Sequence, residues 1–121
     1  MPFSVTVDRE RRLILIAFDG DVSNDTLTEL STAVRSEPAL EEGFGVLYDC
    51  RGAAAINVTG DLVRGMGRRA KPDTNRIAML ANTPAAFGLA RMYQMVAEGE
   101  DRIRIFDSDS EALAWLSGPT A

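Results

Sequence analysis

The sequence predicts a single α/β domain with a mixed, mostly parallel five-stranded sheet and four helices. Apolar runs of strand length alternate with segments of helical periodicity, which indicates parallel strands joined by right-handed crossovers. No linker or low-complexity tract divides the 121 residues, so we assign residues 1–121 to one domain. The expected order of elements is β-β-α-β-α-β-α-β-α.

The first two strands are expected to form an antiparallel hairpin. Apolar and polar residues alternate over residues 3–7, as in a half-buried strand. Residues 13–18 are continuously apolar, which is typical of a central strand covered on both faces. The charged turn 8–12 joins the two strands, and Asp19-Gly20-Asp21 ends the second one.

Capping residues and helix breakers set the remaining bounds. Thr59 is placed to cap the second helix, and Thr83-Pro84 is a strong start for the third. Ser108 and Glu111 predict a capping box for a short last helix. The expected elements are a helix from Ser23 or Asn24 to Arg35, a strand over 45–50, a loop over 51–58, a helix after Thr59 through Ala70, a strand over 76–81, a helix to about Ala97 and an edge strand over 103–105.

The absence of histidine excludes several catalytic designs. A Ser-His-Asp or Cys-His unit cannot be assembled, and neither can histidine-ligated zinc. Cys50 is the single cysteine, and its apolar strand-end context favours a buried small hydrophobic residue, although Arg51 could lower its pKa. Asp49 has no evident catalytic partner and is expected to bond local backbone. We therefore expect no metal, no cofactor and no enzymatic activity.

The charge is acidic overall but uneven. The net charge is −5, which disfavours generic nucleic-acid binding. Residues 51–76 nevertheless carry +4, leaving −9 for the rest of the chain. Arg64 and Arg68 on the second helix form either a solvated face or a patch that recognises an anion or an acidic partner, with Arg51 or Arg76 nearby.

The chain has the features of a cytoplasmic protein. No apolar stretch approaches the roughly 18–20 residues that span a bilayer, so no membrane insertion is expected. The start of the chain lacks the basic and apolar blocks of a secretion signal.

Residues 48–60 resemble the third-strand-to-helix segment of STAS domains, the SpoIIAA-like anti-sigma-factor antagonists. In those domains a strand ends in Asp, a glycine-containing apolar loop follows, and Asp-Ser-Ser-Gly opens a helix. Here Asp49, Gly52 and Gly60 stand at the matching spacing. The run Phe87–Tyr93 looks more like an uncharacterised STAS-like branch of the superfamily. The resemblance covers nearly the whole chain and implies a protein-interaction module.

The same segment departs from the regulatory pattern. The resemblance places Val58 where the family carries its phosphoacceptor serine, while Asn57 replaces the acid and Thr59 the second serine. Since Val58 has no hydroxyl, we expect the usual phosphorylation switch to be absent. Thr59 is either a simple helix cap or, with Asn57 and Gly60, part of a site that binds an anion or receives a phosphate.

The third expected helix is apolar almost all round. Phe87, Met92 and Met95 fall outside its main stripe. They indicate extra core burial, a homodimer interface, or the lining of a pocket shared with Met66. The leading functional hypothesis is a cytoplasmic STAS-like regulatory module that forms a homodimer. The alternative is a carrier or sensor that binds a small apolar or amphipathic ligand between the second and third helices.

Overall fold

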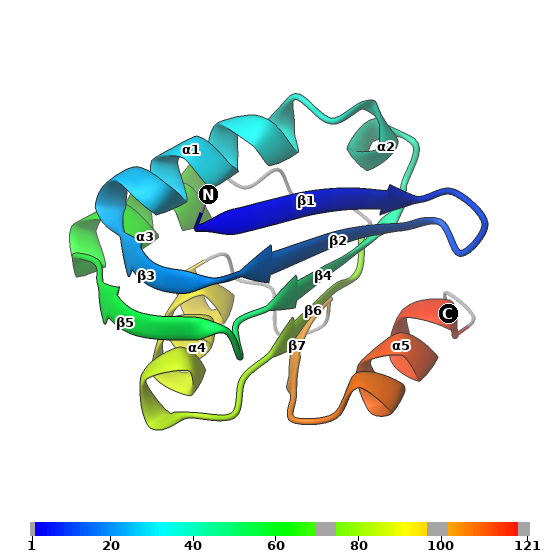
Figure 1. The fold of residues 1–121 in the computed structure, drawn as a ribbon. Helices are drawn as coiled ribbons and strands as arrows, with labels where there is room; N and C mark the ends of the chain where they lie inside the picture. Colours follow the sequence, from blue (N-terminus) through cyan, green and yellow to red (C-terminus); the bar gives the residue numbers. More distant parts are fainter. Residues whose placement is uncertain (1, 70–74, 97–101, 119–121) are drawn as a thin grey trace.

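The computed structural model describes residues 2–69, 75–96 and 102–118 (Figure 1). In these residues the main sheet has five strands, as predicted. In spatial order they are β1 (Phe3–Asp8), β2 (Leu13–Phe18), β4 (Gly45–Asp49), β6 (Ile77–Leu80) and β7 (Ile103–Phe106). β1 and β2 form the predicted antiparallel hairpin, and β2, β4, β6 and β7 are parallel neighbours. β7 lies at the edge, as its alternating charges predicted.

A second, two-stranded parallel sheet was not predicted. It pairs β3 (Gly20–Ser23) with β5 (Ala53–Asn57). We expected a turn and a helix start in the first of these segments and a loop in the second, and the structure corrects both expectations. Gly52 permits the pairing because a Cβ there would collide with the backbone carbonyl of Phe18. Its own carbonyl accepts a hydrogen bond from the Gly20 amide at 3.0 Å.

The described residues form five helices rather than four. They are α1 (Asn24–Arg35), α2 (Pro38–Glu41), α3 (Gly60–Arg69), α4 (Pro84–Val96) and α5 (Asp109–Ser117). α2 was not predicted and is a single helical turn. The predicted continuations through Ala70 and Ala97 lie outside the described residues.

The helices cover both faces of the main sheet. Val46, Ile77 and Met79 point into the larger core beneath α1, α3 and α4. Their strand neighbours Leu47 and Ala78 point the other way, into a smaller core under α5. This alternation follows from the period of two along a strand. Figure 1 shows α5 apart from the other long helices.

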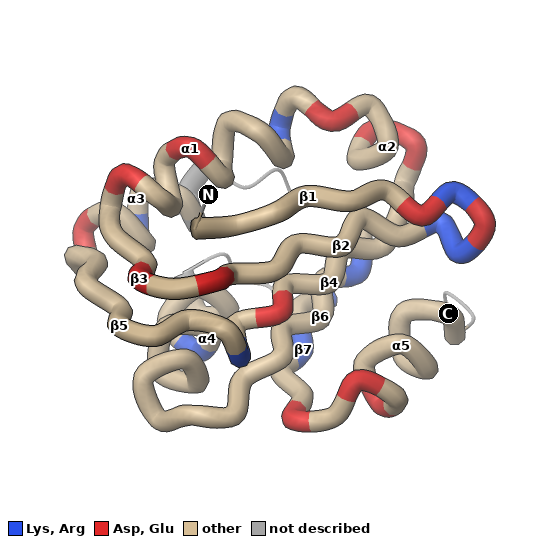
Figure 2. The backbone as a smooth tube through the Cα atoms, in the orientation of Figure 1, with Lys and Arg blue, Asp and Glu red and all other residues tan. Residues whose placement is uncertain are grey.

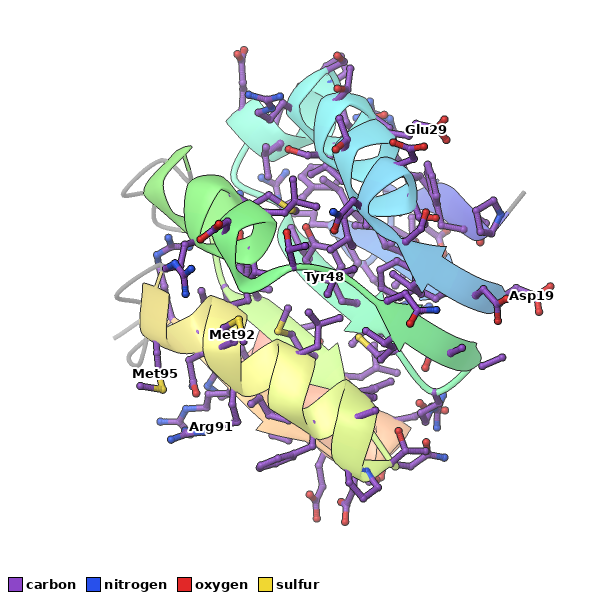
Figure 3. The ribbon with its side chains drawn as sticks, turned by 90° about the vertical axis from the view of Figure 1, so that its left-hand side faces the viewer. Asp19, Glu29, Tyr48, Arg91, Met92 and Met95 are labelled. Atoms are coloured by element: carbon purple, nitrogen blue, oxygen red, sulfur yellow. The ribbon has the colours of Figure 1, made fainter. Side chains whose placement is uncertain are left out.

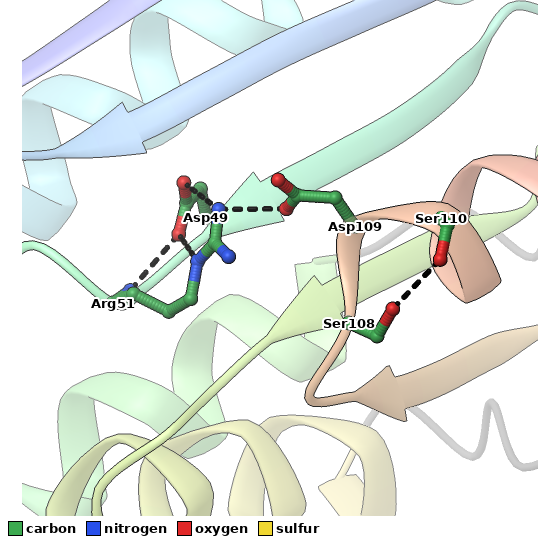
Figure 4. Close-up of polar contacts among 5 residues, drawn as sticks. All are labelled: Asp49, Arg51, Ser108, Asp109 and Ser110. Atoms are coloured by element: carbon green, nitrogen blue, oxygen red, sulfur yellow. Dashed lines mark hydrogen bonds and ion pairs between the residues drawn. The ribbon is translucent and has the colours of Figure 1, made fainter.

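The cap predicted for the first helix is confirmed, whereas the cap predicted for the last helix is wrong. Ser23 caps α1 and forms a reciprocal capping box with Thr26. Ser108 occupies the N-cap position of α5, but its side chain makes no capping hydrogen bond. Its hydroxyl instead lies 2.9 Å from the Ser110 hydroxyl (Figure 4), so the predicted capping box with Glu111 is wrong.

Candidate functional site

Two helix starts lie side by side where the small sheet ends. β3 leads directly into α1, β5 leads into α3, and Ser23 is the register partner of Asn57. The Thr59 amide donates to Asn24 Oδ1 at 3.0 Å, and Asn24 Nδ2 lies 3.5 Å from Thr59 Oγ1. A parallel pairing followed by two helices therefore brings both N-termini to one place on the surface.

Thr59 caps α3, as predicted. Its Oγ1 accepts a hydrogen bond from the Leu62 amide at 3.3 Å, and its carbonyl accepts one from the Val63 amide at 3.3 Å. The side chain is exposed. The hydroxyl and the carbonyl of Thr59 are thus already bonded to amides of the helix that follows.

The neighbouring predicted site residues have mixed environments. Asn57 is exposed, whereas Val58 is half-buried and packs against the larger core. Arg64 folds back over Gly60, so a Cβ at Gly60 would lie 3.2 Å from Arg64 Nη1, and the guanidinium pairs with Asp61. Arg68 belongs to α3, but its side chain lies outside those described.

The surface around the paired helix starts is acidic. Asp25 and Asp61 are both the second residue of their helices, and both are exposed. A carboxylate in a first helical turn compensates the positive end of the helix dipole. Asp21 on β3 and Glu29 on α1 are also exposed. Figure 2 shows this acidic colouring along β3, the first half of α1 and the start of α3. The surface therefore favours a cationic group over an anion.

Arg51 and Arg76 do not extend a basic patch around Arg64. Arg51 Nε donates to Asp49 Oδ1 at 2.9 Å, and its Nη2 lies 2.6 Å from Asp109 Oδ1 (Figure 4). These hydrogen bonds hold the pKa of Asp49 below its ordinary value and raise that of Arg51. Arg76 donates to the Trp115 carbonyl at 2.6 Å on the α5 side of the sheet. We expected Arg51 or Arg76 to lie near Arg64 and Arg68, and these contacts correct that expectation.

Cys50 is buried in the core, and Asp49 is bonded to the backbone beside it. Cys50 is 3% exposed, as expected for a small hydrophobic residue. Burial and the nearby Asp49 raise the pKa of Cys50 to about 12, so the expected lowering by Arg51 is wrong. Asp49 Oδ1 accepts the Arg51 amide at 3.0 Å, which confirms its predicted bond to local backbone.

A cavity of about 300 Å³ lies on the face of the main sheet that α1, α3 and α4 cover, next to the central strand β4. A smaller space of about 40 Å³ continues toward Cys50. Both are bounded by Leu30, Tyr48, Met66 and Tyr93. The larger cavity is also lined by Ser31, Val34, Arg35, Leu40, Glu41, Val46, Asn75, Ile77 and Arg102.

Two tyrosines are among the polar residues that line the cavity. Figure 3 shows Tyr48 between α1, α3 and α4. Desolvation raises the pKa of Tyr48 and that of Tyr93, so both phenols stay protonated. Sequence reasoning missed both; a tyrosine inside a buried aliphatic strand was the available signal for Tyr48.

The residues predicted for a pocket or dimer contact divide into two groups. Met66 lies on the cavity wall. Phe87, Met92 and Met95 lie on the outer side of α4 with exposed fractions of 51%, 39% and 58%. Figure 3 shows Met92 and Met95 pointing outward beside Arg91. The interpretation as extra core burial is therefore wrong for these three residues, and the dimer contact stays a prediction.

The described residues contain no group of three or more acidic or cysteine side chains placed to hold a metal ion. No helix within these described ranges has both the length and the apolar character needed to cross a bilayer.

The comparisons with known proteins identify the fold. No protein-family model matches the sequence, and no curated protein matches it. A solved structure of an uncharacterized protein of the DUF3478 family, from Shewanella loihica PV-4, has a SpoIIAA-like fold and superposes with a TM-score of 0.63. That alignment covers 94% of this chain and 93% of the other at 13% identity. The chain therefore has the SpoIIAA-like fold, which confirms the predicted resemblance at the level of architecture.

Proposed function

We propose that this domain is a non-enzymatic STAS-like regulatory module that docks a basic surface of a partner protein onto its paired helix starts. The paired helix starts comprise residues 23–25, where β3 passes into α1, and residues 57–61, which lead into α3. The observation that supports the proposal most directly is the bond between Asn24 and Thr59, which fixes the two helix starts against each other. A preorganised surface loses less entropy on binding than a mobile one.

The charge of this surface defines the partner's chemistry. Asp25 and Asp61 are exposed at equivalent positions, and Arg64 is already paired with Asp61. Lysine or arginine side chains of a partner would meet two carboxylates and the flanking Asp21 and Glu29. Charge complementarity of this kind speeds association and selects the partner. The anion site predicted from Arg64 and Arg68 has less support, since carboxylates surround the helix starts.

Regulation in this proposal does not use the family's phosphoacceptor position. Val58 carries no hydroxyl and packs against the core. A phosphate on Thr59 would add negative charge beside Asp61. It would also disrupt the hydrogen bond that Thr59 Oγ1 accepts from the Leu62 amide. We therefore propose that binding is controlled by the partner's availability or by a ligand. The cytoplasmic location remains part of this proposal.

Affinity capture with a matched pair of variants tests the docking surface. The wild-type protein is expected to retain one partner stoichiometrically, and the purified partner to bind in calorimetry. Asp25→Lys/Asp61→Lys should weaken that binding by at least about tenfold, because two attractions become repulsions. Glu10→Lys/Glu111→Lys makes the same charge change elsewhere, with one substitution also in a first helical turn, and should bind normally. Equal binding by both double variants would refute the docking surface.

A second candidate function is a carrier or sensor of a small apolar or amphipathic ligand. The cavity beneath α1 and α4 favours it, because a lined concave space with a few polar groups is the usual form of a ligand site. This function would use Met66 with Tyr48 and Tyr93. It does not use the outer side of α4.

A further inference from the structure

We infer that the outer side of α4 pairs with the same helix of a second copy of this chain. The two helices run antiparallel about a two-fold axis, with Met92 of each copy on Gly88 of the other and Met95 on Ala85. The resulting homodimer is weak and reversible. This inference goes beyond the proposed docking surface, and neither one depends on the other.

Four exposed residues of α4 have the spacing of a helix-pairing seam. Ala85, Gly88, Met92 and Met95 are separated by three, four and three positions, and all four are exposed. This is the spacing of the a and d positions in a coiled coil. The core side of the helix uses other residues, among them Ala90, which is 1% exposed. Figure 3 looks onto α4 and shows both methionines pointing outward.

The seam is complementary to itself. Its first half is small, with Ala85 and Gly88, and its second half is large, with Met92 and Met95. An antiparallel pairing centred between Gly88 and Met92 sets every large residue on a small one. A parallel pairing would instead set methionine on methionine and leave a gap at the glycines. A two-fold interface uses the same surface on both copies, so this surface has to fit itself, and it does.

Gly88 is explained by a neighbour from outside the chain. A Cβ at this position would meet no described atom within 4 Å, so packing within the described chain does not require a glycine here. Glycine inside a helix lowers its stability relative to alanine. A glycine on an exposed helix face lets another backbone or a long side chain approach closely. Methionine suits such a contact because its unbranched side chain adapts to the available space.

The charge of the chain favours a second copy at this helix. The net charge is −5, so most surfaces of two copies repel each other. Among the helices of the described residues, α4 alone contains no aspartate or glutamate. Arg91 is the one charged residue within its bounds, and its Nη1 donates to Gln94 Oε1 at 2.9 Å. Two such helices can therefore approach with little repulsion, and salt screens what remains.

The size of the outer side sets the strength of the pairing. The seam from Ala85 to Met95 is about 15 Å long at the rise of an α-helix. Phe87 flanks it and is 51% exposed, while Met92 and Met95 are 39% and 58% exposed. One helix face of this length buries less than the roughly 800 Å² per partner of a standard interface. We therefore expect a dimer that forms at high micromolar concentration and dissociates on dilution.

Sedimentation at concentrations up to about 1 mM tests the pairing. The wild-type protein should dimerise, and more tightly at about 0.5 M salt than at about 0.05 M. Gly88→Met sets a methionine against Met92 of the second copy and should weaken the dimer at least about tenfold. Met92→Ala leaves a gap and should weaken it by a similar factor, because a two-fold contact is lost twice.

Two further variants separate a direct contact from a general effect. Gly88→Met/Met92→Ala again sets a large residue on a small one and should recover most of the wild-type affinity. Ala114→Met adds the same side chain at an exposed position on α5 and should leave the dimer unchanged. Every substitution in this set lies at an exposed position, so each variant should fold, which far-UV circular dichroism checks.

The contrary outcomes are distinct. A dimer that Gly88→Met leaves unchanged or tightens, or that the double variant fails to restore, would overturn the antiparallel arrangement. A dimer indifferent to Met92→Ala would overturn the placement on α4. A monomeric wild-type protein at about 1 mM would overturn the pairing itself and leave this side of α4 to a different protein. None of these results bears on Asp25→Lys/Asp61→Lys, which tests the docking surface.

Discussion

Asn24 and Thr59, 35 residues apart, bind each other at the point where two helices begin. The side-chain oxygen of Asn24 accepts the Thr59 amide, and Thr59 in turn caps α3 through Leu62. One asparagine therefore sets the position of a second helix relative to its own. The relationship exists only because the short strands ahead of both helices pair in parallel.

Removing this link should loosen the paired helix starts. Asn24→Ala is expected to lower the free energy of unfolding by about 1 kcal/mol, the usual net value of a hydrogen bond. Thr59→Ala should cost about 0.5–2 kcal/mol through loss of the cap, and Thr59→Ser should restore most of it. Urea denaturation measures each change. Asn82→Ala, at an exposed asparagine ahead of α4, is the control. A neutral Asn24→Ala would contradict the link's structural role.

Gly52 and Gly88 should respond oppositely to alanine. A Cβ at Gly52 would collide with the Phe18 carbonyl, so Gly52→Ala should destabilise the fold by about 1–3 kcal/mol and disturb the small sheet. A Cβ at Gly88 would have no neighbour within 4 Å, and alanine there should stabilise α4 by about 0.5–1 kcal/mol. Thermal unfolding of the two variants checks both signs. Similar effects at the two glycines would contradict the close approach at Gly52.

The ion pair of Asp49 with Arg51 should give stability that depends on pH. Hydrogen bonds from Arg51 lower the pKa of Asp49 in the folded chain. Its contribution is therefore complete above the ordinary aspartate value of 3.8 and is lost as the pH falls through the lower folded value. Arg51→Met should cost about 1 kcal/mol near neutral pH, after allowance for partial exposure. The free energies of unfolding of the wild-type protein and Arg51→Met, measured at several pH values, should converge below the folded pKa of Asp49. A difference that stays constant with pH would contradict the linkage.

The outer side of α4 should decide whether the protein self-associates. Phe87, Met92 and Met95 form an exposed apolar surface there. If they make the predicted homodimer, sedimentation at high micromolar concentration should show a dimer, and replacing all three by glutamine should leave a monomer. Ala114→Gln, at an exposed position on α5, should leave the dimer intact. A monomeric wild-type protein under these conditions would exclude the dimer.

Local patterns predicted the main sheet because each of its strands either is a continuous apolar run or alternates apolar with polar residues. They could not predict β3 and β5. These segments contain glycine, aspartate and small residues, and only their mutual backbone pairing, far apart in sequence, makes them strands. The helix caps show the same difference between partners that are near in sequence and partners that are far apart. Thr59 was predicted because its partner is three residues away, whereas Asn24 was read only as a possible cap.

The candidate sites were less predictable than the fold. Tyr48 lies in a run that reads as core from its neighbours, and no local signal tells which face of a strand borders a cavity. The apolar excess of α4 was recognised, but its direction was not: the same residues would suit a core or a surface. Arg51 was counted toward a basic patch because Asp109, its second partner, lies far away in sequence.

Hydrogen exchange of the complex with the captured partner tests the docking surface most directly. The account predicts that amides of residues 22–28 and 57–64 become protected when the partner binds, while exchange along α4 stays as in the free protein. Protection concentrated on residues 84–95, with the paired helix starts unchanged, would contradict it.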